Sequence, residues 1–222
     1  KNHGKKVIIK KIFKRIFLKN SIYNFYLTKS TPVNILITPN DPWPGDPSIG
    51  KNISQGDFSF STKNKELISQ KLLWKINNNR DFWQEEIHSF SWLRHLKARS
   101  GPLARKHARI LILNWLKKNS KWNETAWKLD ILARRITSWT TNISFLLAEK
   151  DEEFASVLYL SLQKQIKHLS IFATKRSLQK LNQNPEDSIS SIKKFKILRG
   201  LVLSGVCFEG GELRYKKSME FL

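Results

Sequence analysis

The stretch 122–139 constrains the fold most, because its apolar residues recur at the spacing of a helix that faces a core. Asn123 is suited to cap the N-terminus of such a helix, and Glu124 to complement its dipole. At about 100° per residue, one sector of this helix collects the apolar side chains. That sector contains Ile131, Leu132, Ile136 and Trp139, with Arg135 among them.

An arginine inside an apolar sector has two interpretations. The stem of Arg135 can cover apolar surface while its guanidinium reaches the edge of the domain. Alternatively, the guanidinium is held in a cleft against an anionic or hydroxyl-rich ligand, with Trp139 one turn away as a stacking surface. The sequence leaves both open.

The composition allows a real core and indicates a polyanionic partner. The chain has 222 residues, of which 40% are hydrophobic, so one large domain or two small ones can form. A formal net charge of +22 predicts attraction to nucleic acid, an acidic membrane surface or an acidic polysaccharide. Lysines occur in nearly every segment, so a merely solvated basic surface is an equal alternative.

Several classes of site find no match in the sequence. The single cysteine, Cys207, excludes an intramolecular disulfide and a cysteine-rich zinc site, and its apolar neighbours predict burial. Phosphate-loop, nucleophile-elbow, zinc-protease and dinucleotide-binding motifs are absent, so we expect no cofactor and no metal. The sequence has no apolar run of about 18 residues, so we expect no transmembrane helix. The sequence leaves the localisation of the protein open.

The organisation along the chain is predicted in three parts. Residues 1–30 form a basic amphipathic segment, in which a helix over 5–27 either lies on an anionic membrane or docks on the domain. Residues 31–80 form a Pro/Gly-rich loop, with one or two short strands, at most a β-hairpin, around Phe58 and Phe60. Residues 81–222 are helical, and we expect a chain truncated at its C-terminus.

The helical part is predicted to be all-α, with antiparallel hairpins, because long helices are joined by short turns. The predicted helices cover 82–98, 102–118, 124–141, 151–175, 187–206 and 211 to the end.

A histidine and aromatic cluster in the first of these helices is a second candidate site. His88 and Trp92 lie one turn apart on one face, with His95 one turn further. A base beside a tryptophan that supports a sugar ring, a buried aromatic cluster with a satisfied histidine, and part of a metal site are the alternatives. A third metal ligand is not evident.

An ordered set of short motifs resembles the N-terminal half of bacterial heparinase II/III-like proteins. The motifs are Asp41-Pro-Trp-Pro-Gly-Asp-Pro, Gly50, Gly56-Asp-Phe, Trp83, His88-Ser-Phe-Ser-Trp-Leu-Arg-His-Leu, Asn114-Trp-Leu, Trp122, Ala133-Arg-Arg-Ile-Thr-Ser-Trp and Leu198-Arg-Gly-Leu-Val-Leu-Ser-Gly-Val-Cys. The resemblance implies an incomplete (α/α) toroid, a C-terminal β-sandwich domain beyond this chain, and β-elimination on acidic polysaccharides.

The resemblance does not assign catalytic residues. Where characterised relatives carry an Asn-His pair, this chain has Ser191, Ile192 and Lys193. Spacing and resemblance together predict substrate-binding residues, which are Arg135, Trp139, His88, Trp92 and Arg134.

The sequence therefore predicts the toroid domain of a bacterial polysaccharide lyase that is catalytically incomplete alone, with an acidic polysaccharide as its partner. The alternative is a non-catalytic helical module that binds polyanions or membranes through residues 5–27. Nucleic acid is an unlikely partner, because only the charge favours it.

Overall fold

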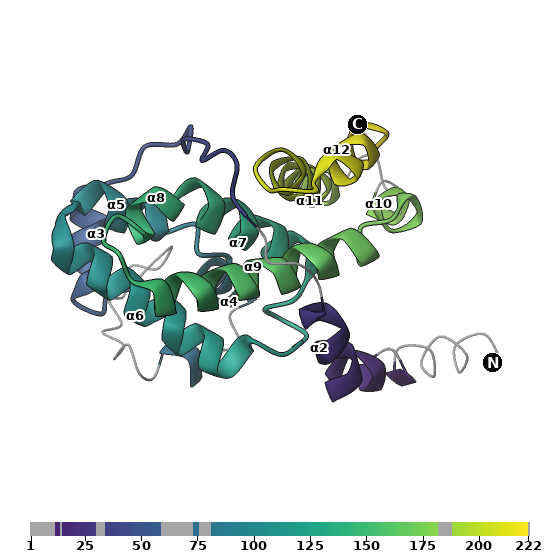
Figure 1. The fold of residues 1–222 in the computed structure, drawn as a ribbon, viewed down its shortest axis with the longest axis horizontal. Helices are drawn as coiled ribbons and strands as arrows, with labels where there is room; N and C mark the ends of the chain where they lie inside the picture. Colours follow the sequence, from purple (N-terminus) through teal and green to yellow (C-terminus); the bar gives the residue numbers. More distant parts are fainter. Residues whose placement is uncertain are drawn as a thin grey trace.

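The protein is all-α in the part of the chain that the computed structural model describes, which is residues 12–13, 15–29, 34–58, 73–75, 81–181 and 188–221 (Figure 1). The helices are α2 (Ser21–Thr28), α3 (Pro47–Ser54), the short 3-10 helix η1 (Leu73–Lys75), α4 (Asp81–Ser89), α5 (Leu93–Arg99), α6 (Gly101–Asn119), α7 (Leu129–Thr141), α8 (Ile143–Leu146), α9 (Glu152–Phe172), α10 (Lys175–Leu181), α11 (Ser188–Val206) and α12 (Glu212–Met219). Among these residues no extended strand forms, and one isolated antiparallel bridge joins Ile35 to Phe208.

Helix α7 is the centre of the fold. It packs against α11, α4, α9 and α5, and all of its residues from Asp130 to Thr141 except Arg134 are buried. In Figure 1, α9 runs along one side of α7, and α11 with α12 lies beyond its other side. The polar residues of α7 are therefore largely shielded from water, and their hydrogen bonds depend on neighbouring elements.

A close helix crossing fixes the position of α11. A Cβ added at Gly200 would lie 2.7 Å from the Cβ of Ala133 and 2.9 Å from its Cα, so only glycine fits there unless the helices move apart. The absence of a side chain at Gly200 therefore lets the backbone of α11 approach α7 directly.

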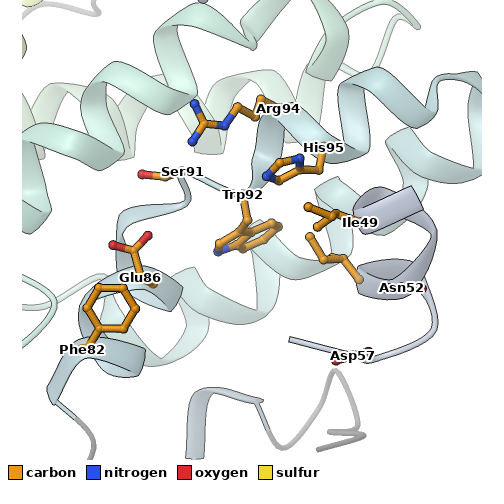
Figure 2. A pocket seen from close by; sticks show the side chains of 10 residues that line it. Ile49, Asn52, Asp57, Phe82, Glu86, Ser91, Trp92, Arg94 and His95 are labelled. Carbon is orange, nitrogen blue, oxygen red and sulfur yellow. The ribbon is translucent and has the colours of Figure 1, made fainter. Parts of the chain in front are cut away.

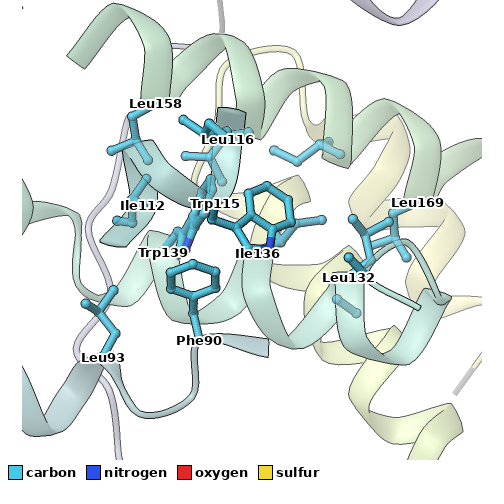
Figure 3. Packing of buried hydrophobic residues seen from close by; sticks show 14 of the residues in the cluster. Phe90, Leu93, Ile112, Trp115, Leu116, Leu132, Ile136, Trp139, Leu158 and Leu169 are labelled. Atoms are coloured by element: carbon cyan, nitrogen blue, oxygen red, sulfur yellow. The ribbon is translucent and has the colours of Figure 1, made fainter. Parts of the chain in front are cut away.

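An aromatic cluster fills the core where α4, α5, α6 and α7 meet (Figure 3). The ring of Phe90 lies 4.9 Å from that of Trp92, 5.3 Å from that of Trp139 and 5.9 Å from that of Trp115, measured between centroids. Phe90 also has a φ of 57°, in the left-handed region that a bulky residue rarely adopts. The turn at Phe90 separates α4 from α5, so the single helix predicted over 82–98 is wrong.

The helix predicted over 124–141 also begins later than expected, at Leu129. Asn123 Oδ1 does accept a hydrogen bond from the backbone N–H of Ala126, at 2.7 Å, but this closes a turn rather than a helix. The predicted helices over 102–118, 151–175, 187–206 and 211 onward correspond to α6, α9, α11 and α12. Asp151 caps α9 by accepting from the N–H of Phe154 at 2.9 Å.

The N-terminal third differs most from expectation. Residues 47–54 form α3 rather than part of the predicted loop, because Asp46 caps the helix and Pro47 occupies its first turn. Of the two residues around which strands were predicted, Phe58 lies in no strand and Phe60 lies outside the described residues. Within 5–27, residues 15–19 and α2 are helical, but Asn20 interrupts them by capping α2; residues 5–11 lie outside the described part.

Candidate functional site

Arg135 lies in the core and is completely buried, with 0% of its surface exposed. Its Nε donates to Oε1 of Gln165 at 2.7 Å, and its Nη1 donates to the carbonyls of His88 and Ala126, both at 2.8 Å. The guanidinium lies 4.3 Å from the ring centroid of Trp115, and burial lowers the pKa of Arg135. The guanidinium thus links three parts of the protein. Both interpretations of Arg135 from the sequence are therefore wrong, because its guanidinium neither reaches the edge of the domain nor opens to a cleft.

His88 is a buried hydrogen-bond acceptor. Its Nδ1 accepts from Nε1–H of Trp115 at 3.0 Å, which assigns the proton of the neutral ring to Nε2. Burial, with a smaller contribution from the positive charge of Arg135, lowers the pKa of His88 to about 3. His88 therefore stays neutral at physiological pH.

This pKa predicts a pH dependence of stability that His88→Gln removes. The folded-state pKa lies below the unfolded value of about 6.5, so the neutral ring contributes stability that is complete above pH 6.5 and lost as the pH falls toward 3. Between these limits we expect the unfolding free energy of the wild type to fall more steeply than that of His88→Gln, by up to about 1.4 kcal/mol per pH unit. Urea unfolding at a series of pH values measures the difference, and parallel curves would contradict the assignment.

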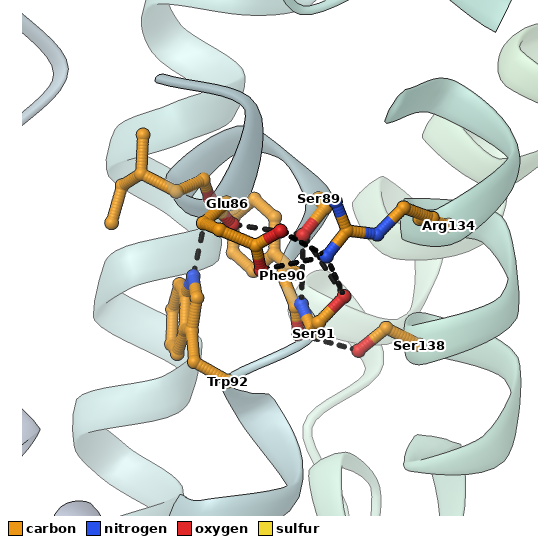
Figure 4. A network of polar contacts seen from close by, with 8 residues as sticks. Glu86, Ser89, Phe90, Ser91, Trp92, Arg134 and Ser138 are labelled. Carbon is orange, nitrogen blue, oxygen red and sulfur yellow. Dashed lines mark hydrogen bonds and ion pairs between the residues drawn. The ribbon is translucent and has the colours of Figure 1, made fainter. Parts of the chain in front are cut away.

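A polar network connects α7 to the α4–α5 turn (Figure 4). Nη2 of Arg134 lies 2.6 Å from both carboxylate oxygens of Glu86 and donates to Oγ of Ser91 at 3.0 Å. Ser138, one turn along α7, donates from Oγ to the carbonyl of Phe90 at 2.6 Å. Arg134 is thereby held at the surface beside the turn while its neighbour Arg135 points into the core.

Two pockets flank this network, separated by Ser91 and Arg94. The first has a volume of about 250 Å³ and lies between α3, α4 and α5, with Trp92 at its base and Glu86 and His95 at its sides (Figure 2). His95 has a structural role, because its Nδ1 accepts a hydrogen bond from the backbone N–H of Asp46 at 2.9 Å. This pocket is of mixed charge and presents no strong preference for an ion.

The second pocket, which we call the basic pocket, has a volume of about 290 Å³. Four chain segments meet there. It is lined by Asp41, Trp43, Ser91, Arg94, Arg134, Thr137, Ser138, Lys196 and Arg199. Four cations against one lining carboxylate make it the stronger candidate site for an anionic group.

The structure separates the five predicted substrate-binding residues. Arg134 lines the basic pocket, whereas Arg135 and Trp139 are fully buried, Trp92 is 2% exposed and His88 is 7% exposed. Direct contact between a ligand and these four residues stays a prediction. The contacts that the structure describes place all four side chains in the core. Sequence reasoning missed Trp43, Arg94, Thr137, Lys196 and Arg199; the available signal was the one-turn spacing of Lys196 and Arg199 on one helix.

Other types of site are not evident in the described ranges. No group of three or more His, Cys, Asp or Glu side chains there could hold a metal ion. In the same part of the chain, no helix combines the length and the apolar character needed to cross a bilayer.

Comparison with known proteins gives one informative similarity. The chain is 29% identical over 139 residues to FtsZ-localized protein C of Caulobacter vibrioides (strain NA1000 / CB15N), across 62% of this chain. The matched region is 24% of that protein, so this chain spans about a quarter of its relative's length. No family model matches the chain. No solved structure matches it either.

This similarity corrects the functional interpretation of the sequence. The relative is named for localisation with FtsZ, so the assignments to heparinase II/III-like proteins and to a polysaccharide lyase are wrong. The predicted partners, an acidic polysaccharide, an anionic membrane at 5–27 and a C-terminal β-sandwich domain, are corrected with them. The physical reason is that short motifs such as Ala133–Trp139 are explained by core packing around Arg135 and need no bound sugar.

Proposed function

We propose that this chain is a non-catalytic helical interaction module that localises with FtsZ by binding it. The observation that carries the proposal is the 29% identity over 139 residues to FtsZ-localized protein C. The alignment covers 62% of this chain.

The charge of the chain supports a role in binding. A net charge of +22 attracts acidic partners over distances of about a Debye length and accelerates their association. Two polar side chains of the core, by contrast, are bound within the protein: Arg135 donates to two carbonyls and to Gln165, and His88 accepts from Trp115. Binding through the basic surface therefore accounts for these features better than catalysis does.

Sedimentation with polymerised FtsZ from the same organism tests this function. We expect the purified chain to pellet with FtsZ polymers and to stay in the supernatant without them. Raising the salt concentration should weaken the association, because exposed charges are screened. A chain that stays in the supernatant at low salt with polymers present would contradict the proposal.

Two finer features of the architecture also remain predictions. One is the arrangement of the helical hairpins as part of an (α/α) toroid, and the other is the division into 1–30, 31–80 and 81–222. The packing of α2 on α9 and of α3 on α5 favours a single folded unit over three independent parts. Limited proteolysis tests the division: cuts near 30 and 80 that release a stable 81–222 fragment would support it.

A further inference from the structure

We propose that the basic pocket binds a short acidic peptide segment of the partner protein, with carboxylates seated among its four cations and an apolar residue against Trp43. This inference rests on the proposed function, since it names the surface and the chemistry through which the module would hold FtsZ.

Charge in the basic pocket is only partly balanced by the protein itself, because Glu86 pairs with Arg134 and Asp41 lies near Arg199, whereas the other two cations have no such partner among the described residues. Within the described part of the chain, no carboxylate lies within ion-pairing distance of Arg94 or Lys196. Arg199 is 3.8 Å from Asp41, a long contact for an arginine whose side chain is 41% exposed. Burial, and after it the positive charge of Arg134, lowers the pKa of Lys196, while the nearby carboxylates of Glu86, Asp130 and Glu85 act in the opposite direction.

Unsatisfied polar atoms line the same pocket. Oγ1 of Thr137 and Nε of Arg94 are buried and have no hydrogen-bond partner among the described residues. Thr137 is 8% exposed, and a buried hydroxyl without a partner costs free energy unless a ligand or water supplies one. A carboxylate, which accepts several hydrogen bonds, matches the guanidinium groups among the lining residues.

The loop that carries Trp43 is fixed over the pocket. Asp41 Oδ1 accepts from the backbone N–H of Trp43 at 3.2 Å, which closes a turn. A Cβ added at Gly45 would lie 2.2 Å from the carbonyl oxygen of Arg94, so the loop touches the backbone of α5 directly. Trp43 nevertheless remains 60% exposed and offers an aromatic surface beside the four cations.

The size of the pocket favours a peptide over a larger ligand. Sites that enclose a whole small molecule have volumes of about 300–1,000 Å³. At about 290 Å³, the basic pocket is at the lower limit of that range and suits one or two acidic side chains that protrude from a chain held outside. Its cations are gathered in one hollow rather than spread along a track, which favours an acidic peptide over a nucleic-acid backbone.

A matched pair of double variants tests the pocket with polyglutamate as the probe. Lys196→Ala/Arg199→Ala removes two positive charges from the pocket, and Lys117→Ala/Lys118→Ala removes two exposed ones at the end of α6. We expect the first to weaken binding of fluorescent poly-L-glutamate by about tenfold or more, and the second by much less. Trp43→Ala should weaken the binding of peptides that have an apolar residue beside their carboxylates.

Equal losses in the two double variants would overturn the inference, because net charge alone would then explain binding. Tighter binding of a single-stranded oligonucleotide than of polyglutamate, lost in Lys196→Ala/Arg199→Ala, would also overturn the assignment to a peptide. Urea unfolding of each variant confirms that the fold is retained.

Peptides from FtsZ separate this inference from the proposed function. Among overlapping synthetic peptides that together cover FtsZ, we expect acidic ones to bind the wild type and not Lys196→Ala/Arg199→Ala. If this variant sediments with FtsZ polymers to the same extent as the wild type, the module binds FtsZ through another surface and only the pocket assignment fails. If polyglutamate binding depends on the pocket but FtsZ polymers pellet neither protein, the proposed function fails and the pocket chemistry stands.

Discussion

Replacing Arg135 with alanine should destabilise the protein by about 4 kcal/mol, the largest effect we expect from a single substitution. The change would leave the carbonyls of His88 and Ala126 and the amide oxygen of Gln165 buried without their donor. It would also open a cavity at a completely buried side chain beside the ring of Trp115. Urea unfolding followed by tryptophan fluorescence measures the loss.

Two further variants separate packing from hydrogen bonding at this position. Arg135→Met keeps the length of the stem, so its loss of stability should come mainly from the three unpaired acceptors and amount to about 2–3 kcal/mol. Arg134→Met on the same helix removes a partly exposed guanidinium and should cost about 1 kcal/mol. If the two methionine variants were equally stable, the buried hydrogen bonds of Arg135 would contribute nothing specific.

The helices that were predicted well have boundaries set by neighbouring residues. Asp151 caps α9 through its own side chain, and Pro102 falls in the first turn of α6, where its missing N–H is not needed. Such signals lie within a few residues of the boundary, so the sequence displays them. The same logic applied to Asp46 and Pro47, but the surrounding prolines favoured a loop and concealed α3.

The break between α4 and α5 depends instead on distant residues. Phe90 adopts a positive φ while its ring packs against Trp115 of α6 and Trp139 of α7, and Ser138 donates to its carbonyl. These contacts join positions far apart in the sequence and stabilise a conformation that the local sequence disfavours. Helical periodicity alone therefore predicted one continuous helix.

The basic pocket was not predictable for a related reason. Its cations come from α5, α7 and α11, and its aromatic residue comes from a loop near position 43. Which face of α11 meets α7 depends on the crossing at Gly200. Arg134 was predicted as a binding residue, but no pattern in the sequence brings it together with Lys196 and Arg199.

This crossing leads to the second large expected effect, from Gly200→Ala. The new Cβ would lie 2.7 Å from the Cβ of Ala133 and 2.9 Å from its Cα, distances that force α11 away from α7. Overpacking of this kind costs about 1–3 kcal/mol. The higher helix propensity of alanine offsets about 1 kcal/mol or less of this cost. We expect a net loss of about 1–2 kcal/mol in urea unfolding.

The double variant Ala133→Gly/Gly200→Ala tests whether the contact itself is responsible. Removing the Cβ of Ala133 relieves the 2.7 Å contact but leaves the Cα of residue 133 at 2.9 Å, so recovery should be partial. Lys196 and Arg199 of the basic pocket lie on α11, whereas Arg134 and Thr137 lie on α7. The shift of α11 in Gly200→Ala should therefore also weaken polyglutamate binding. The double variant should recover part of this binding. Gly200→Ala with unchanged stability and unchanged binding would show that the helices can separate without cost, and that their close approach does not shape the pocket.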